Sequence, residues 1–464
     1  MSAGWCMGAT VKILLVLCCF VFRGDSISDT IIRGNTKFHT METSPSENKT
    51  VIYFSYMAAS ESQEYQREKQ ARLISGALSY AVSKINNDSN LLPNHTLAFK
   101  WSDTLSDELE VLRQMCHSWT DEVYAFFGPE TYCGVAARLA AAWNTPMISY
   151  KCATHEVSNK TIYPTFARTF PPANQVTKFI VSLLKHHNWT QYSLVVGSSN
   201  RMMDIKSKLV QLSTEYNLSI INITTYKEPY IPIVGNSEIP GIVNNTYPHT
   251  RIYVFLGDQN GIVDFMCNLY DMGVLDGGKY IVIYIDHMPY NKNGSLKYFK
   301  KAMDNPTDNL NCGAAARSLL VMAPQPPSNR NYKHFEKMVN EYNEKAPFNF
   351  PDPFAAGKKV PLFAAHLYDA VYLYAECIHN MLLENLNIRN GTDVINRIRN
   401  KRFQSIQGFQ CLIDENGDAL GNYSLLAWKE DYSPNREANF SMDPVGSFII
   451  DNHKSLPVSQ LRFL

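Results

Sequence analysis

VYAFFGPETYCGVAARLAAAWNTPMISY, residues 123–150, decides the fold class of this chain. Its first part is apolar and aromatic up to a Gly-Pro pair, which is typical of a short buried strand that ends in a turn. Small and apolar residues at 133–144 then favour a helix, and residues 145–150 favour a second strand. A strand, a helix and another strand in this order predict a right-handed unit with parallel strands.

The same alternation precedes this stretch. Apolar residues at 51–57 predict a strand, and those at 67–87 recur on one face of a helix. A further strand is predicted at 95–103 and a further helix at 106–119. Together with residues 123–150, these elements predict a mostly parallel sheet flanked by helices.

A second series of similar size begins near residue 170. Periodicity is lost at 228–248 and at 291–311, where Pro, Gly and Asn predict surface loops. The predicted elements of the second series are a helix after Pro171 and Pro172, strands at 192–197, 218–224, 251–258 and 280–286, and helices at 202–216 and 261–272.

The C-terminal third returns to both series instead of starting a third one. It predicts a long apolar helix at 361–386, a charged helix at 392–401 and a β-hairpin at 407–428 that turns at Asn416 and Gly417. A chain that returns in this way crosses between its two lobes more than once, and several such crossings form a hinge.

We therefore expect two α/β lobes. The first comprises residues 51–165, joined by a crossing segment at about 361–395. The second comprises residues 166–360 with about 400–450. A length of 464 residues agrees with two lobes, because one core rarely organises so long a chain. The 43 basic and 43 acidic residues cancel, which gives no electrostatic reason to expect nucleic acid as a partner.

The N-terminus indicates secretion. Lys12 precedes an apolar run from Ile13 to Phe22, which is too short for a membrane span and has the length of a signal-peptide core. We expect a signal peptide at 1–26, a flexible segment at 27–50 and a C-terminal tail at 451–464. No later segment has the apolar length of a membrane span, so the mature chain is expected to be secreted or to face the cell exterior.

Two further patterns agree with that compartment. Three of the ten cysteines, Cys6, Cys18 and Cys19, lie in the predicted signal peptide, and an oxidising compartment would pair most of the others. Sequons for N-glycosylation are frequent. They occur at Asn48, Asn87, Asn94, Asn159, Asn188, Asn217, Asn222, Asn244, Asn293, Asn390, Asn422 and Asn439.

Several segments together resemble a known family. FFGPE followed by a cysteine, AAWNTPMISYKC, YPTFARTFPPANQ, HHNWTQYSLVVG and IDENGDALGNYSLLAW stand in the order found in extracellular ligand-binding regions of receptor guanylyl cyclases of the natriuretic-peptide-receptor type. The resemblance runs from about Val51 to about Ile450. It implies the type I periplasmic-binding-protein fold and a receptor for an extracellular peptide or small molecule, acting as a homodimer.

The chain also departs from that family. The familiar architecture continues into a membrane span, a kinase-like region and a cyclase domain, which are missing before Leu464, so we expect no cyclic GMP synthesis by this chain itself. Related peptide receptors hold a chloride at a tight GPGC turn. Here Glu130 replaces the second glycine and the cysteine is displaced to Cys133, which disfavours a chloride. We expect no cofactor and no metal.

Ligands of open α/β sheets meet the loops at the carboxyl ends of the strands. Amino-acid receptors with this fold bind between the lobes, whereas peptide-hormone receptors bind between two subunits, and both sites remain open here. The strand-end rule predicts as ligand-binding residues Ser55, Tyr56, Gly128, Glu130, Ser149, Tyr150, Asp258 and Asp286. The resemblance to amino-acid receptors, in which Ser and Thr bind a carboxylate near residues 149–154, implies Thr154 as well. Arg168, on a strand near the crossover, is a further candidate. Arg168 has the alternative role of a salt-bridge partner between the lobes, and Ser149 and Glu130 that of capping residues.

The topology also bears on the disulfides. Cys133 and Cys152 follow neighbouring strands at the same edge, within bridging range. We further predict the pairs Cys267–Cys312 and Cys377–Cys411. Cys116 is then left as a buried thiol or as a bridge between subunits.

An enzymatic function finds little support in the sequence. GxSxG, HExxH, P-loop and GxGxxG patterns are absent, and His155 with Glu156 lacks the second histidine of a zinc motif. The alternatives to a signalling receptor are a secreted binding or decoy protein and an ectodomain of the glutamate or GABA receptor type.

Overall fold

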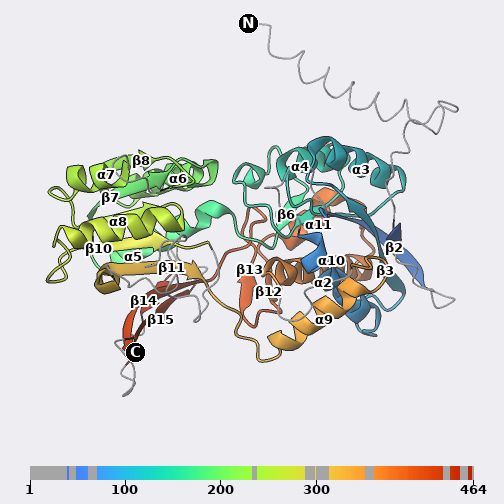
Figure 1. Cartoon of the computed structure of the whole chain (residues 1–464). Coiled ribbons are helices and arrows are strands. Elements are labelled where there is room, and N and C mark those ends of the chain that lie inside the picture. The colour runs from blue at the N-terminus through green and yellow to red at the C-terminus, as the bar shows by residue number, and fades with distance from the viewer. Residues whose placement is uncertain are drawn as a thin grey trace, which may run out of the picture. The chain divides into compact units, whose positions relative to one another are not determined.

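The computed structural model describes residues 39–40, 49–60, 70–231, 238–287, 298, 313–350, 360–431, 439–449 and 458–461. The chain forms two α/β units, which Figure 1 shows with their elements labelled. Unit 1 comprises Met1–Cys152, Asn159–Ala167 and His334–Ile398. Unit 2 comprises Ala153–Ser158, Arg168–Lys333 and Arg399–Leu464.

A mostly parallel sheet organises unit 1. Its strand order is β1-β3-β2-β4-β5-β6, with β3, β2, β4 and β5 parallel and β1 antiparallel to β3. The strands are β1 (His39–Thr40), β2 (Thr50–Ala58), β3 (His95–Asp103), β4 (Phe126–Phe127), β5 (Met147–Ser149) and β6 (Phe166–Arg168). The βαβ units predicted around residues 123–150 are present.

Helices pack on this sheet because each has an apolar face that must be buried away from water. The long helix α10 is buried along most of its length, as predicted, and packs against α2. Helix α3 begins where the side chain of Asp107 accepts a hydrogen bond from the backbone N–H of Glu110. The helices of unit 1 are α2 (Ala71–Asn86), α3 (Glu108–Thr120), α4 (Cys133–Ala142), α9 (Tyr332–Glu344), α10 (Phe363–Leu383) and α11 (Gly391–Ile398).

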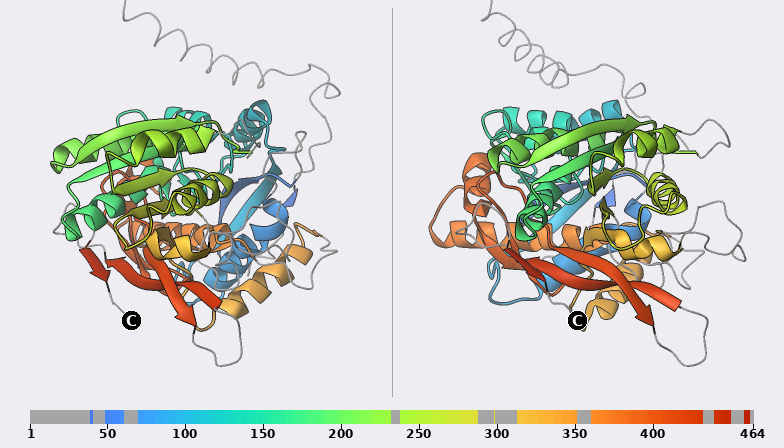
Figure 2. Two further views of the ribbon diagram at one scale, coloured as in Figure 1. Left: turned by 60° about the vertical axis from the view of Figure 1, so that its left-hand side comes forward. Right: turned by 90° about the vertical axis from the view of Figure 1, so that its left-hand side faces the viewer.

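A larger sheet organises unit 2. Its order is β16-β15-β14-β11-β10-β9-β7-β8, parallel from β8 to β11 and antiparallel beyond. Figure 2 shows β14 and β15 as the long red strands. The strands are β7 (Gln191–Gly197), β8 (Ser219–Tyr226), β9 (Ile252–Leu256), β10 (Ile281–Ile285), β11 (Leu319–Pro324), β14 (Tyr423–Asp431), β15 (Asn439–Ile449) and β16 (Val458–Leu461).

Each face of this sheet has its own apolar core. Alternate residues of the strands pack against α7 (Glu238–Thr246) and α8 (Gln259–Asp271) on one face. The intervening residues pack against α5 (Val176–His186) and α6 (Asn200–Glu215) on the other. Burial on both faces explains why the strands are almost continuously apolar.

Strand β8 is the exception, because it forms the edge of the sheet. Its residues alternate between exposed and partly buried, and Ile221 and Ile223 expose 38% and 44% of their surface. An edge strand has unpaired backbone groups along one side, so apolar side chains there are unusual.

A buried ion pair holds together the segments of unit 2 that lie nearest the crossings. Arg168 is fully buried, and its Nε donates to Oδ1 of Asp418 at 2.7 Å. Its other nitrogens donate to the carbonyl of Thr154 at 2.7 Å and to the hydroxyl of Ser158 at 2.8 Å. The backbone of Arg168 also pairs with Gly417 and Ala419. The three segments that make up unit 2 thus meet at one arginine.

The structure corrects three predicted elements. Residues 334–360 were expected in the second lobe, but the part from His334 belongs to unit 1 because α9 packs beside α2. The predicted loop at 228–248 contains helix α7. The turn at Asn416 and Gly417 is present and its nearest flanks pair, Ile413 with Ala419, but the hairpin is shorter than predicted. Beyond it, β13 (Gln410–Leu412) pairs with β12 (Arg402–Gln404), and β14 pairs with β11 and β15.

The disulfides follow the prediction in part. Cys133 and Cys152 are bonded, with their Cα atoms 6.0 Å apart. Cys267 is disulfide-bonded, and its predicted partner Cys312 lies outside the described residues. The predicted Cys377–Cys411 bridge is wrong, because both are buried thiols and each belongs to a different unit. Cys116 is a half-buried thiol in α3.

The sequons differ in accessibility. Asn48 and Asn293 lie outside the described residues, and Asn439 begins β15. Asn222, Asn390 and Asn422 are half-buried. The exposed ones are Asn87, Asn94, Asn159, Asn188, Asn217 and Asn244. Glycosylation itself stays a prediction.

No helix in the described ranges combines the length and apolarity that a bilayer crossing requires.

The packing of α2 on α9 gives a testable prediction. A Cβ atom at Gly76 would lie 2.0 Å from the carbonyl oxygen of Val339, whereas one at Gly241 in α7 would meet nothing within 4 Å. Gly76→Ala is expected to lower the free energy of unfolding by about 1–3 kcal/mol through overpacking. Gly241→Ala is expected to raise it by about 0.4–1 kcal/mol, because alanine loses less backbone entropy in a helix. Urea unfolding of both variants measures the two signs, and equal effects would contradict the close approach.

Candidate functional site

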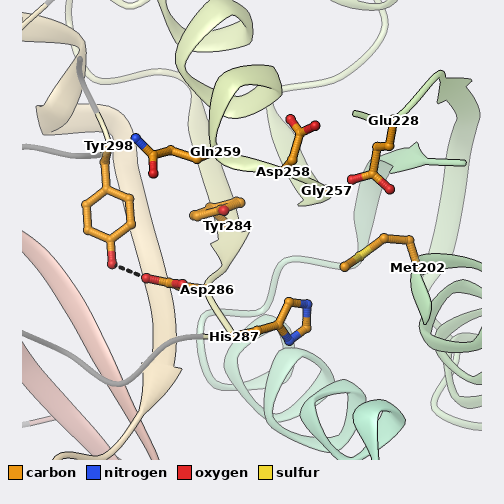
Figure 3. Close-up of a pocket in the computed structure, with 9 residues that line it drawn as sticks. All are labelled: Met202, Glu228, Gly257, Asp258, Gln259, Tyr284, Asp286, His287 and Tyr298. Atoms are coloured by element: carbon orange, nitrogen blue, oxygen red, sulfur yellow. Dashed lines mark hydrogen bonds between the residues drawn. The ribbon is translucent and has the colours of Figure 1, made fainter. Parts of the chain in front are cut away.

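A pocket of about 270 Å³ opens in unit 2 at the carboxyl ends of β8, β9 and β10. In parallel sheets this edge is where ligands bind, because the strands end there and variable loops begin. Figure 3 shows the nine residues that line it. They are Met202, Glu228, Gly257, Asp258, Gln259, Tyr284, Asp286, His287 and Tyr298.

Asp258 follows β9 and caps helix α8. Its Oδ1 accepts a hydrogen bond from the N–H of Gly261 at 2.8 Å, and its Oδ2 accepts one from the N–H of Tyr230 at 2.6 Å. The hydroxyl of Tyr226 lies so close that a Cβ atom at Gly257 would come within 1.8 Å of it. Glycine at 257 is therefore required for the tyrosine to reach this loop.

Asp286 follows β10 and is buried. Its Oδ2 accepts a hydrogen bond of 2.6 Å from the hydroxyl of Tyr298, and its backbone N–H donates to the carbonyl of Met322 on β11. Asp286 is thus held through both its side chain and its backbone at the carboxyl edge of the sheet. Figure 3 shows this bond as the dashed line.

Glu228 enters the pocket from the end of β8. Its Oε2 accepts a hydrogen bond of 3.1 Å from the N–H of Ser199, and its own N–H donates to the hydroxyl of Ser198. A Cβ atom at Gly197 would lie 2.1 Å from the Glu228 carboxyl carbon. The glycine at the end of β7 therefore makes room for this side chain.

Burial and neighbouring charges of both signs shift the pKa values of residues that line the pocket. Burial raises the pKa of Tyr284, and the carboxylates of Asp286, Asp258 and Glu228 raise it further in that order. Burial likewise raises the pKa of Asp258, against the two backbone donors that stabilise its charge. Burial and then Arg201 lower the pKa of His287 to about 4, so its imidazole is neutral at extracellular pH.

The predicted site residues of unit 1 lie in its interior. The hydroxyls of Ser55 and Ser118 share a hydrogen bond of 2.9 Å. Ser149 accepts one of 3.0 Å from the N–H of Cys152, which stabilises the bend after β5. A Cβ atom at Gly128 would lie 2.2 Å from the carbonyl oxygen of Met57, so this glycine serves the turn.

The other three predicted residues of unit 1 form a buried cluster. The hydroxyl of Tyr150 donates to the Met57 carbonyl at 3.3 Å and to Oε1 of Glu130 at 3.4 Å. The hydroxyl of Tyr56 pairs with that of Ser75 at 2.9 Å. Burial raises the pKa of Glu130 to about 8, although backbone N–H groups of Gln70 and Ala59 favour its charged form.

The four predicted residues of unit 2 separate into two groups. Asp258 and Asp286 lie together in the pocket. Thr154 is exposed, and its carbonyl accepts a hydrogen bond from Arg168. Both members of the Arg168–Asp418 ion pair belong to unit 2, so the predicted bridge between the lobes is instead a bond within one unit. A ligand-binding role for any of the predicted residues stays a prediction.

Sequence reasoning missed Glu228, Tyr284 and Tyr298. The strand-end rule had selected Asp258 and Asp286, and it would have selected Glu228 if β8 had been predicted to Tyr226 instead of to Thr224. Tyr284 lies inside β10 and looks like any core aromatic residue in the sequence. In the described part of the chain, no group of histidine, cysteine and acidic side chains is arranged to hold a metal ion.

These features define a class: a ligand-binding α/β protein with its pocket at the carboxyl edge of a parallel sheet. The family model for the receptor family ligand binding region matches residues 73–431. The chain belongs to this family, whose fold is of the type I periplasmic-binding-protein kind. The matched region is a binding region and not a catalytic domain.

Individual relatives are receptors. The chain is 35% identical over 434 residues to the receptor-type guanylate cyclase Gyc76C of Drosophila melanogaster, covering 87% of this chain and 28% of the relative. It is 28% identical over 406 residues to the speract receptor of Strongylocentrotus purpuratus, covering 81% and 36%. It is 24% identical over 306 residues to atrial natriuretic peptide receptor 2 of Anguilla japonica, covering 65% and 28%. The chain spans about a third of the length of these relatives.

The buried Glu130 gives a prediction for pH. Its pKa is about 8 in the folded protein and near 4.5 when exposed, so the folded state binds more protons than the unfolded state between these values. The free energy of unfolding should therefore fall as pH rises from about 4.5 to 8, by up to about 1.4 kcal/mol per pH unit. Glu130→Gln should flatten this slope and stabilise the protein at pH 8.

Urea unfolding from pH 5 to 8.5 measures the slope. Glu344→Gln, at an exposed residue at the end of α9, is the matched control and should keep the wild-type slope. A Glu130→Gln variant with the wild-type slope would show that Glu130 is ionised in the folded protein.

Proposed function

We propose that this chain is the extracellular ligand-binding part of a receptor guanylate cyclase. The observation that carries the proposal is the family match over residues 73–431, which spans both units. The pocket supports it, because it lies at the sheet edge where binding proteins of this architecture place ligands. Several relatives are named as receptors, and two of those names are of natriuretic peptide receptors, which favours a peptide ligand.

The proposed location is outside the cell. The N-terminal apolar run, the exposed sequons and the Cys133–Cys152 disulfide all favour the secretory pathway. Attachment to a membrane would come from further sequence of the kind that the relatives' greater length allows.

The proposed mechanism is a shift between arrangements of the two units. The chain passes between the units after Cys152, Ser158, Ala167, Lys333 and Ile398, so the crossings are the natural hinge. A ligand that binds one arrangement better moves the equilibrium toward it, by no more than the difference in its two affinities.

A chimeric receptor tests the proposal. The chain is fused to the membrane span and cyclase of the Drosophila relative, expressed in cultured cells, and challenged with fractionated peptide extracts while cyclic GMP is measured. We expect at least one fraction to raise cyclic GMP. A bivalent antibody against an N-terminal tag serves as the positive control for cyclase competence. Activation by the antibody with no response to any fraction would count against the receptor function.

We also propose that two copies associate through helix α3. Leu109, Leu112, Cys116 and Trp119 recur at intervals of three and four residues, so they form one stripe on the helix. Leu109 exposes 70% of its surface and Trp119 exposes 39%. The ring of Trp119 stacks on Trp143 at 5.1 Å, which extends the apolar surface towards α4. A second copy of the same face would cover it symmetrically.

Replacing an exposed leucine in this stripe tests the association. Leu109→Glu places a charge in the proposed interface and is expected to weaken dimerisation by about tenfold or more. Leu383→Glu is the matched control, because Leu383 at the end of α10 is 69% exposed and lies outside the stripe. Sedimentation velocity of the glycosylated chain gives the dissociation constants. A monomeric wild type, or equal effects of the two variants, would contradict the proposed interface.

A further inference from the structure

Glu130 is a buried acid of unit 1 with one unpaired oxygen. It follows strand β4 in the turn at residues 128–132 and exposes 6% of its surface. Its Oε1 lies 3.4 Å from the hydroxyl of Tyr150, whereas its Oε2 is buried and has no hydrogen-bond partner. Buried polar atoms are almost always paired in folded proteins, so this oxygen calls for an explanation other than stability.

The charged groups of the neighbouring elements do not compensate a charge on Glu130. Burial raises its pKa to about 8, with a contribution from the acid Asp103 at the end of β3. The ammonium of Lys151 lies over the ring of Phe363, 5.2 Å from its centroid, and Nε of Arg72 donates to a backbone carbonyl at 3.1 Å. A buried carboxylate without a cation is costly, so the group keeps its proton below this pH.

Two tyrosines complete the cluster and do not compete for the proton. The rings of Tyr56 and Tyr150 lie 6.1 Å apart. Burial raises the pKa of both hydroxyls, and the charge of Glu130 raises both further. Both phenols therefore stay protonated where Glu130 titrates. Within this cluster, Glu130 is the group that changes charge in mildly alkaline surroundings.

Backbone donors are positioned for the ionised form. The N–H groups of Gln70 and Ala59 favour a charged carboxylate at Glu130, although neither donates to its Oε2 in this structure. Gln70 directly precedes helix α2, whose first turn has no side-chain cap. The positive end of a helix dipole favours an anion at this place. Loss of the proton therefore draws the side chain of Glu130 away from Tyr150 and towards the start of α2.

The backbone around Glu130 is held on both sides. A Cβ atom at Gly128 would lie 2.2 Å from the carbonyl oxygen of Met57, so the turn lies directly against β2. Cys133, at the start of α4, is bonded to Cys152. The turn therefore has little freedom to move as a whole. A change of charge at Glu130 acts on its side chain and on the donors that face it.

We propose that Glu130 is a pH-dependent switch at the carboxyl edge of unit 1. Protonated, it rests on the hydroxyl of Tyr150; ionised in alkaline surroundings, it takes the N–H groups of Gln70 and Ala59 and so caps helix α2. The inference goes beyond the proposed receptor function and does not depend on it.

Direct contact with a ligand fits this cluster less well. Tyr56 and Tyr150 expose none of their surface, and Glu130 exposes almost none. A ligand would have to open the interior of unit 1 to reach these side chains. Protons reach buried groups through brief local openings, so burial does not prevent a response to pH.

Infrared difference spectroscopy of the glycosylated full-length chain tests the protonation. Between pH 7 and 9.5 we expect the band of a protonated carboxyl group to disappear with a midpoint near 8. Glu130→Gln should lack this band, and Glu344→Gln, at an exposed residue at the end of α9, should keep it. Tyr150→Phe removes a donor that favours the charged form, so its midpoint should rise. A spectrum in which Glu130→Gln and wild type titrate alike would overturn the inference.

Hydrogen exchange, followed by mass spectrometry with fragmentation to single residues, tests the movement. After correction for the intrinsic effect of pH, the amides of Ala59 and Gln70 should gain about tenfold in protection between pH 7 and 9 in the wild type and not in Glu130→Gln. The amide of Gly128, which donates to the carbonyl of Ile148 at 3.3 Å, is the internal control and should not change. Titration of Glu130 without a gain at Ala59 and Gln70 would refute the switch.

Neither measurement needs a ligand, which separates this inference from the proposed function. If peptide fractions activate the chimeric receptor while Glu130 does not titrate, the receptor function stands and the switch is refuted. If Glu130 titrates and the two amides gain protection while no fraction activates the chimera, the switch stands and the receptor function is refuted.

Discussion

The buried ion pair between Arg168 and Asp418 is the interaction on which the architecture of unit 2 depends. A guanidinium with no access to water needs every donor satisfied, and here the donors hold the segment at Thr154 and Ser158 and the turn at Asp418. These are the segments beside the points where the chain passes between units. Removal of one partner from such a pair typically costs about 3–5 kcal/mol, so these segments are held firmly within unit 2.

The pocket follows from the topology anchored in this way. Parallel strands place the ends of β8, β9 and β10 at one edge, and the loops after them supply acidic residues. Two glycines let those loops approach: Gly197 accommodates Glu228, and Gly257 accommodates the hydroxyl of Tyr226. The site is therefore built by backbone geometry as much as by the side chains that line it.

Much of this could be inferred from the sequence, for physical reasons. Alternating apolar strands and amphipathic helices predicted both parallel sheets, and the strand-end rule predicted Asp258 and Asp286. Glu228 escaped because β8, at the edge of the sheet, has a weak apolar pattern whose end is hard to place. The Cys377–Cys411 pairing failed because sequence order says nothing about the unit to which a returning segment belongs. Tyr284 was missed because an aromatic residue within a strand has the same sequence pattern whether it lines a pocket or packs in the core.

Strand β8 has a consequence for how the protein is handled. Ile221 and Ile223 face outward on a sheet edge whose backbone is open to pairing with another chain, a recognised route to aggregation. The exposed sequon asparagine at Asn217 lies two residues before this strand. A carbohydrate there would sterically hinder the pairing of this edge with the edge strand of another molecule. Recombinant protein from a bacterial host lacks that modification, so its β8 edge would be unprotected and the protein would aggregate more readily.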